Sequence, residues 1–222
     1  EKERQLLFAN MAHDLRTPIT TIHGSAKAVA DGLVSEDKLN QTMETIITKT
    51  NHMNELVNRF LVFSKLESPD YHLQQQKIDL SELLREVLLE HLDLAEKNQI
   101  DMIIDLTDDP LEIFGDPIEL RRVFDNLIGN SIQHNSANTT VQIRLYPLNH
   151  QVILEIKDNG NPIPKELQEH LFEPFVSGDS SRTTKNGSGL GLAISKKIVE
   201  KHGGKISFVE LNEHEKMFRV IL

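Results

Sequence analysis

His13 and Asp14 are the neighbouring residues in this sequence whose types best suit nucleophilic chemistry. They open the run His13-Asp14-Leu15-Arg16-Thr17-Pro18. Asp14 can accept one imidazole proton and leave the other ring nitrogen free to attack an electrophile. Pro18 removes a backbone hydrogen bond from a helix and usually kinks it. The run predicts an accessible, reactive histidine, although a lone histidine is more often an ordinary surface side chain.

Asn126 and Asn130 lie four residues apart in a segment predicted to be helical, so their amides share one face of the helix. Amide oxygens suit Mg²⁺, which takes a few hard protein ligands and completes its shell with water and phosphate oxygens. The pair therefore predicts a metal site. The simpler alternative is a pair of solvated or capping asparagines.

Asp158 and a later glycine-rich run are candidates for nucleotide binding. Asp158-Asn159-Gly160 ends a predicted strand, where the carboxylate can accept a hydrogen bond from an exocyclic amine such as that of adenine. Gly187-Ser188-Gly189-Leu190-Gly191-Leu192 leads into a predicted helix, and glycines there let backbone amides approach a phosphate. Between them, Phe172-Glu173-Pro174-Phe175 introduces a polar run at 176–186. Each segment alone can be an ordinary turn or loop, but their joint order favours a functional site.

The first 66 residues, which must position His13, are predicted to form two long helices. Apolar residues recur there at alternating spacings of four and three, a heptad pattern that needs a partner helix. Residues 32–37 separate the helices, with Ser35 as the predicted N-cap of the second. A single hairpin leaves apolar surface exposed to solvent, so we expect two copies to form a dimeric four-helix bundle. A simple dimerising coiled coil is the alternative. The two seams comprise Phe8, Ala12, Leu15, Ile19, Ile22, Ala26, Val29 and Leu33, then Leu39, Met43, Ile46, Thr50, Met53, Val57 and Phe60.

The rest of the chain alternates strand and helix patterns. Ser81 is the predicted N-cap of the first helix of this part, and Pro117 opens the second. Helices on one side of a mixed sheet make an α/β sandwich, so the whole chain is of the α+β class. The predicted strands cover 77–80, 100–106, 112–115, 140–148, 151–157, 205–210 and 216–222, and the predicted helices cover 81–98, 117–134 and 190–202.

Composition excludes several classes of protein. The 222 residues contain no Cys, which removes a disulfide framework, a thiolate zinc site and a cysteine nucleophile. No apolar run approaches the ~20 residues that cross a bilayer. The net charge of −10 argues against general nucleic-acid binding, which depends on Lys and Arg meeting phosphates.

The negative charge is unevenly distributed. Residues 67–125 hold 16 acidic and 5 basic side chains, whereas residues 182–205 hold 6 basic and 1 acidic. The net charge therefore does not argue against a nucleotide at the glycine-rich run, where the local balance is positive.

With these segments in this order, the sequence resembles the cytoplasmic catalytic core of bacterial sensor histidine kinases over nearly its full length. His13–Pro18 is similar to the family's phosphoacceptor box, and the four later segments are similar to its N box, first glycine box, F box and second glycine box. The resemblance implies a dimerisation and histidine-phosphotransfer hairpin (1–66), a linker (67–76) and an ATP-binding domain (77–222). That domain would have the Bergerat fold shared with the Hsp90, gyrase B and MutL ATPases.

The resemblance also implies roles in phosphoryl transfer. His13 would accept the phosphoryl group, with Asp14 assisting its attack. Thr17 matches the position that orients water in kinases that also dephosphorylate their partner. Asn130, with Asn126 beside it, would hold Mg²⁺ against the triphosphate of ATP.

Further implied roles concern the nucleotide itself. Asp158 would contact the adenine amino group, and Gly160 would give the base room. Residues 176–188 would form a lid over the nucleotide. Phosphate contacts are expected from residues in and after this lid: Arg182, Lys185, Gly187, Gly189, Leu190 and Gly191.

Two positions depart from the family pattern. Gln133, followed by His134, stands where the family often has Lys followed by an aromatic residue. Pro162 replaces the second glycine of the first glycine box. Because proline fixes φ and lacks an N–H, any amide contact there is lost. We interpret both departures as tuning of nucleotide affinity.

The implied activity is ATP-dependent autophosphorylation of His13, followed by transfer to an aspartate of a response regulator, with phosphatase activity through Thr17 as an addition. Two alternatives stay open: an ATPase resembling Hsp90 or MutL, and a non-catalytic dimeric pseudokinase scaffold. The expected partners are a second copy, through residues 1–66, and a receiver domain. We expect the cytoplasmic portion of a bacterial cell-membrane protein, in contact with the membrane only through segments outside this sequence.

Overall fold

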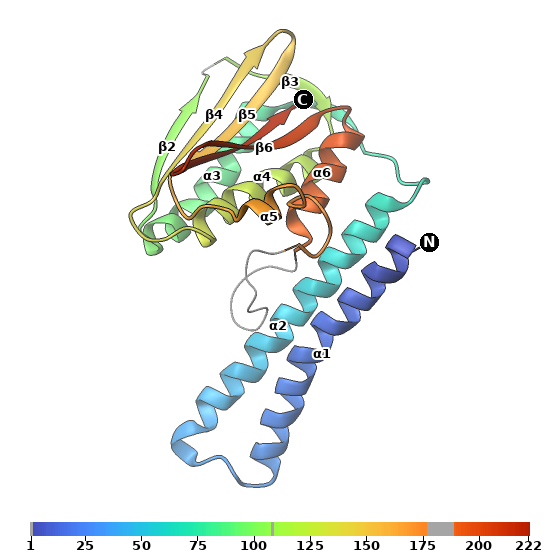
Figure 1. The fold of residues 1–222 in the computed structure, drawn as a ribbon, viewed down its shortest axis with the longest axis vertical. Coiled ribbons are helices and arrows are strands. Elements are labelled where there is room, and N and C mark those ends of the chain that lie inside the picture. The colour runs from blue at the N-terminus through green and yellow to red at the C-terminus, as the bar shows by residue number, and fades with distance from the viewer. Residues whose placement is uncertain (1, 108, 177–188) are drawn as a thin grey trace.

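Two long antiparallel helices precede a layered α/β domain in the computed structural model, which describes residues 2–107, 109–176 and 189–222 (Figure 1). The helices are α1 (Lys2–Ala30) and α2 (Glu36–Glu67), as the heptad pattern predicts. α1 continues through Pro18, whose side chain is buried. Ser35 is the N-cap residue of α2, but its side chain makes no capping hydrogen bond.

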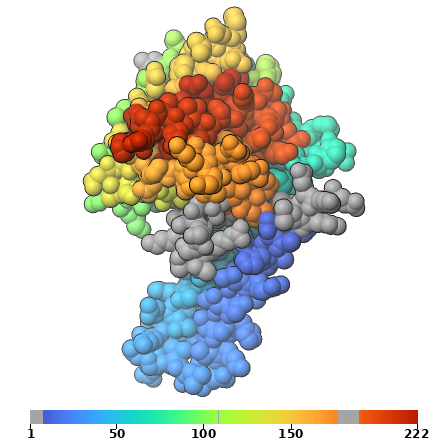
Figure 2. All heavy atoms as spheres, in the orientation of Figure 1, coloured from blue at the N-terminus to red at the C-terminus, as the bar shows by residue number. Residues whose placement is uncertain are grey.

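The hairpin formed by α1 and α2 projects from the broader domain, and Figure 2 shows it as a narrow extension. Several large apolar side chains on it are exposed in the single chain. They include members of both predicted seams, so the surface is suited to a second copy. The exposed residues are Phe8, Ile19, Leu33, Leu39, Met43, Ile47 and Leu61.

A five-stranded mixed sheet forms one layer of the second domain, in the order β2-β4-β5-β7-β6. β2 pairs in parallel with β4, and the other neighbours are antiparallel. The mixed sheet predicted from the sequence is thus confirmed. The strands are β2 (Asp101–Leu106), β4 (Thr140–Leu148), β5 (Gln151–Asp158), β6 (Lys205–Asn212) and β7 (Glu215–Ile221).

Three helices cover one face of this sheet (Figure 1). They are α3 (Leu80–Lys97), α4 (Pro117–Gln133) and α6 (Gly191–Lys201). Their apolar faces and the inward side chains of the strands share one buried core, which includes Leu84, Leu120, Phe124, Ile143, Ile156 and Ile198. Burying each such side chain is worth roughly 1.5–3 kcal/mol, so this core holds the site's supporting elements in place.

Three smaller elements flank the sheet. β1 (Gln76–Asp79) and β3 (Glu112–Gly115) pair with each other as a separate two-stranded sheet, which the sequence pattern did not reveal. α5 (Lys165–Gln168) is a single turn and was also missed. None of the helices within the described ranges combines the length and hydropathy that crossing a bilayer requires.

The prediction that Ser81 caps α3 is wrong. Asp79 is the N-cap residue, and its Oδ1 accepts hydrogen bonds from the N–H groups of Ser81 (2.9 Å) and Leu111 (3.1 Å). The one carboxylate oxygen thus caps the helix and ties the segment before β3 to it, while Ser81 is buried inside the first turn. α4 begins at Pro117, as predicted, and Asp116 is its N-cap residue.

The base of the hairpin packs against the α/β domain. Phe60, Phe63 and Leu66 of α2 belong to the same buried cluster as α4 and α6. Glu67, at the end of α2, also forms an ion pair with Lys197 of α6 at 2.6 Å. The two parts are therefore joined through α6, the helix that follows the glycine-rich run.

Candidate functional site

His13 presents an imidazole to solvent on the outer surface of α1. Its side chain is 61% exposed, and its Nδ1 lies 3.2 Å from Oδ1 of Asp14. When Nδ1–H donates a hydrogen bond to this carboxylate, the imidazole lone pair is on Nε2, which makes Nε2 the nucleophilic nitrogen. Thr17 is exposed one turn further along the same helix. The structure thus brings the three predicted residues of this segment to one accessible stretch of α1.

Asn126 and Asn130 have different surroundings although both lie on α4. The Asn126 amide nitrogen donates to the Gly191 carbonyl oxygen (3.3 Å) and to Ser195 Oγ (3.4 Å), which ties α4 to α6. Within the described residues, the half-buried Asn130 side chain makes no hydrogen bond. Asn130 is therefore the amide that can turn both its polar atoms toward a ligand.

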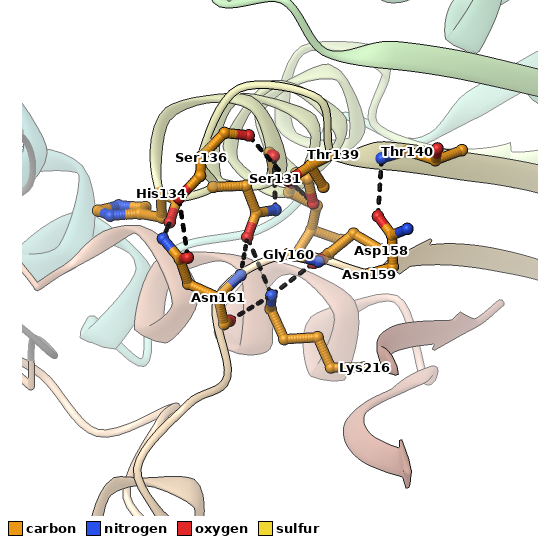
Figure 3. A network of polar contacts seen from close by, with 12 residues as sticks. Ser131, His134, Ser136, Thr139, Thr140, Asp158, Asn159, Gly160, Asn161 and Lys216 are labelled. Atoms are coloured by element: carbon orange, nitrogen blue, oxygen red, sulfur yellow. Dashed lines mark hydrogen bonds and ion pairs between the residues drawn. The ribbon is translucent and has the colours of Figure 1, made fainter. Parts of the chain in front are cut away.

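Asp158 ends β5 as a nearly inaccessible carboxylate, with 1% of its surface exposed. Its Oδ1 accepts hydrogen bonds from the Gly160 N–H (3.0 Å) and from the ammonium group of Lys216 on β7 (Figure 3). Its Oδ2 is buried and has no hydrogen-bond partner among the described residues. Because buried carboxylate oxygens are rarely left without a donor, this oxygen is suited to the amine of a ligand.

The space beside Gly160 is taken by Asn135, from the loop after α4. A Cβ added to Gly160 would lie 2.0 Å from the Asn135 amide oxygen. That oxygen also accepts from the Asn161 N–H at 3.0 Å, and the Asn135 amide nitrogen donates to the Ser131 carbonyl oxygen at 2.8 Å. The absent side chain at Gly160 thus lets the loops after α4 and β5 touch, whereas the sequence resemblance implied room for a base.

Phe175 and Gly189 connect the predicted F box to the start of α6. The Phe175 N–H donates to the Gly189 carbonyl oxygen at 2.9 Å. Phe172, three residues earlier, packs edge-on against Phe218 of β7, with ring centroids 6.3 Å apart. A hydrogen bond with Glu173 raises the pKa of the exposed His170. The F-box segment is therefore attached to β7 through Phe172 and to the residues that begin α6 through Phe175.

Leu190 and Gly191 form the entrance to α6. Leu190 is buried, and Gly191 is the first helical residue. A Cβ added to Gly191 would lie 3.4 Å from the amide oxygen of Asn126. Amide N–H groups at a helix start favour an anion such as a phosphate. The predicted phosphate contacts Arg182, Lys185 and Gly187 lie outside the described residues.

Lys216, Asn135 and Asn161 form part of the site but carry no recognisable motif, so they were missed from the sequence. Lys216 lies directly opposite Asp158 in the antiparallel pairing of β5 and β7. The pairing register of β5 with β7 would have identified Lys216. Predicting the two strands separately does not give that register.

The donor set around α4 fits Mg²⁺ better than a softer metal. In the described part of the chain, no group of three or more His, Cys, Asp and Glu side chains could hold a metal ion. The two amide oxygens of Asn126 and Asn130 remain as hard ligands. That is enough for Mg²⁺ when substrate phosphates and water complete its shell.

Two family models match successive parts of the chain. The "His Kinase A (phospho-acceptor) domain" matches residues 3–69, and the "Histidine kinase-, DNA gyrase B-, and HSP90-like ATPase" matches residues 115–222. The first contains His13 and the second contains Asn126, Asn130 and Asp158. The chain belongs to the sensor histidine kinase family.

Similar proteins share both parts of this histidine kinase core. Sensor protein kinase WalK of Staphylococcus aureus is 32% identical over 210 residues, which cover 93% of this chain and 50% of WalK. The match to another WalK sequence of that species, from strain Newman, covers 34% of that sequence. The chain thus spans half or less of the length of the curated relatives it matches.

Two solved structures have the same arrangement of the histidine kinase core. Histidine kinase AdeS of Acinetobacter baumannii superposes with a TM-score of 0.78 at 25% identity, covering 95% of this chain and 96% of that one. Histidine kinase ThkA, solved in complex with the response regulator protein TrrA, superposes with a TM-score of 0.79 at 28% identity. The superposition covers 100% of this chain and 64% of that one. The predicted hairpin followed by an α/β ATPase domain is confirmed.

Proposed function

We propose that this chain transfers the γ-phosphoryl group of ATP to His13 and then passes it to an aspartate of a response-regulator receiver domain. The observation that carries the proposal is the exposed His13 imidazole, whose Nδ1 is engaged by Asp14, so that Nε2 is left as the nucleophilic nitrogen. An ATPase without a phosphoacceptor would have no use for this pair.

The chemistry divides between the two parts of the chain. Asp14 holds the Nδ1 proton while the Nε2 lone pair forms a bond to the γ-phosphorus, and the bond from that phosphorus to the β–γ bridging oxygen breaks to release ADP. Asn130, with Asn126, would hold Mg²⁺, which neutralises charge on the phosphate oxygens when bound. Positioning by the protein and this neutralisation account for most of the catalysis expected in phosphoryl transfer.

The nucleotide would lie between α4, the end of β5 and the start of α6. Asp158 would accept a hydrogen bond from the adenine amine through its unpartnered Oδ2. Gly189, Leu190 and Gly191 would present backbone N–H groups to the phosphates. Arg182, Lys185 and Gly187 stay predicted phosphate contacts, and Gly160 supports the loop beside the base.

Partner binding follows from the hairpin. The exposed seam residues support a homodimer through residues 1–66, because a four-helix bundle would bury them. A receiver domain is the second partner, supported by the likeness to ThkA in its complex with a response regulator. Thr17, one turn after His13, would orient water for dephosphorylation of that partner.

One labelling experiment tests the proposal. The protein is incubated with γ-labelled ATP and Mg²⁺, and the protein-bound label is examined for acid lability in the wild type, His13→Ala and the control His23→Ala, which alters another exposed histidine of α1. Acid-labile label in the wild type and control, absent from His13→Ala, is the expected result. Free phosphate without labelled protein would instead identify an ATPase, and no turnover a scaffold.

A further inference from the structure

Lys216 is a buried lysine whose ammonium group is fully occupied by protein acceptors. It contacts Oδ1 of Asp158, the Asn135 amide oxygen at 3.0 Å and the Asn161 carbonyl oxygen at 2.6 Å (Figure 3). An ammonium group has three protons to donate, and these three acceptors use them all. Lys216 is therefore a fixed part of the site, with no proton left for a ligand.

This arrangement divides the two oxygens of Asp158. Oδ1 receives the Lys216 ammonium and the Gly160 N–H, whereas Oδ2 has no partner within the described residues. The ammonium group also favours one orientation of the carboxylate, because turning the carboxylate would break the ion pair. The site thus offers one negatively charged acceptor atom where a free carboxylate would offer two.

We propose that Lys216 is a positioning residue that sets base specificity, by leaving Asp158 a single acceptor suited to adenine and closed to guanine. The proposal rests on the proposed function, in which Asp158 contacts the base of ATP. It adds Lys216 to the residues that determine base binding, and it gives a physical reason why the site would distinguish adenine from guanine.

The two purines present different edges to a carboxylate. Adenine offers its exocyclic amine as a donor, and one oxygen is sufficient for it. Guanine has a carbonyl oxygen at the matching position, which a carboxylate oxygen repels. To bind, guanine would need to turn its ring N–H and amine toward both carboxylate oxygens, and Lys216 already occupies one of them.

Neighbouring groups keep the ammonium group in place. Asn135 is itself held by hydrogen bonds to the Ser131 carbonyl oxygen and the Asn161 N–H. Lys216 therefore connects β7 to the end of β5 and to the loops that follow α4 and β5. Movement of the ammonium would cost several hydrogen bonds at once, so the selection of one oxygen is built into the fold.

The test compares the binding of Mg-ATP, Mg-GTP and Mg-ITP by titration calorimetry in the full chain. The wild type should bind ATP more tightly than GTP or ITP by at least about tenfold, the usual effect of one lost charged hydrogen bond. In Lys216→Met, Oδ1 keeps the Gly160 N–H but loses the ammonium group, so it can accept a second hydrogen bond from a ligand beside Oδ2. ATP binding should therefore weaken and GTP binding improve relative to ATP. ITP, which lacks the amine, should gain less than GTP because it offers one donor.

Controls separate this role from a structural one. Lys157→Met removes another ion pair between β5 and β7, with Glu215 at 2.6 Å, and should keep the wild-type ratio. Lys216→Arg keeps a cationic donor and should keep the ATP preference. A folded Lys216→Met with an unchanged ATP-to-GTP ratio would overturn the proposal, whatever its absolute affinity.

The wild-type ranking is a second, independent measurement, needed if Lys216→Met fails to fold. A wild type that binds GTP as tightly as ATP would also overturn the specificity role. A wild type that binds no Mg-nucleotide would count against the proposed function instead, so the two failures are distinguishable.

Discussion

The carbonyl oxygen of Gly189 accepts a hydrogen bond from the main-chain N–H of Phe175 at 2.9 Å, and both residues have left-handed backbone conformations, with φ of +63° and +65°. A Cβ on Gly189 would lie 2.7 Å from the Phe175 backbone. Phe175 tolerates its conformation because its ring is buried in the core. The pair holds the end of the F-box segment against the start of α6.

Gly189→Ala is expected to destabilise the fold and weaken ATP binding. The new methyl group would meet backbone atoms that have little freedom to move, in addition to the strain of a left-handed alanine, for a total of about 2–3 kcal/mol. Urea unfolding measures the stability and calorimetry the affinity. Gly203→Ala is the control, because Gly203 has a φ of +77° but open space around it. Equal losses in both variants would mean that the contact with Phe175 is unimportant.

Asn130→Ala is expected to weaken Mg²⁺-dependent ATP binding by at least about tenfold with little change in stability, because a ligand to the metal is lost but no side-chain hydrogen bond to another described residue. Calorimetry with and without Mg²⁺ gives the affinity, and thermal unfolding gives the stability. Asn126→Ala should lower stability as well, since it removes the hydrogen bonds from α4 to α6. Asn54→Ala, on the exposed face of α2, should change neither. Unaltered ATP affinity in Asn130→Ala would refute the metal-site assignment.

Tyr71, in the segment between α2 and β1, is expected to make stability sensitive to alkaline pH. Burial, followed by the hydrogen bond donated to Glu119, raises its pKa from 10.0 to about 12. Because the folded state favours the protonated phenol, its contribution is complete below pH 10 and is lost as the pH rises toward 12. The stability difference between wild type and Tyr71→Phe, measured by urea unfolding, should therefore shrink over this interval.

The tyrosine titration can be followed directly by absorbance. The chain has two tyrosines, and burial also raises the pKa of Tyr146. Tyr71→Phe should lose the transition near pH 12, while Tyr146→Phe should retain it. If the transition remained in Tyr71→Phe, the contact with Glu119 would not be protecting the phenol.

Met43→Lys is expected to dissociate the proposed homodimer. Met43 belongs to the predicted seam of α2 and is 45% exposed in the single chain, and an ammonium group there would have to be desolvated in a four-helix bundle. Sedimentation at several concentrations should show a dimer for the wild type and a monomer for the variant. Leu148→Lys, at a similarly exposed site on β4, should remain dimeric. A monomeric wild type would contradict the proposal.

Local pattern was enough to predict most elements of the fold. The heptad spacing of α1 and α2 and the strict alternation of β4 and β5 are short-range features, and the structure confirms them. Capping was less predictable. Asp79, not Ser81, caps α3, because the carboxylate also serves the N–H of Leu111, which is distant in sequence.

In the candidate site, too, local sequence predicts some features and not others. Sequence alone is enough to indicate the family, because each motif lies within a few residues of chain. The motifs are His13–Pro18, Asn126, Asn130, Asp158 and Gly189–Gly191. The different environments of Asn126 and Asn130 could not be predicted, because they depend on how α6 packs against α4.

Chain-local information thus specified two helices with an exposed, paired histidine and an α/β domain with nucleotide-binding motifs. Tertiary structure alone decided that β1 and β3 form their own sheet, that Asn135 fills the space beside Gly160, and that Lys216 lies opposite Asp158. The physical reason is strand register. A cross-strand pair is set by the packing of whole strands and helices, so the partner that limits Asp158 to one oxygen becomes visible only in the folded chain.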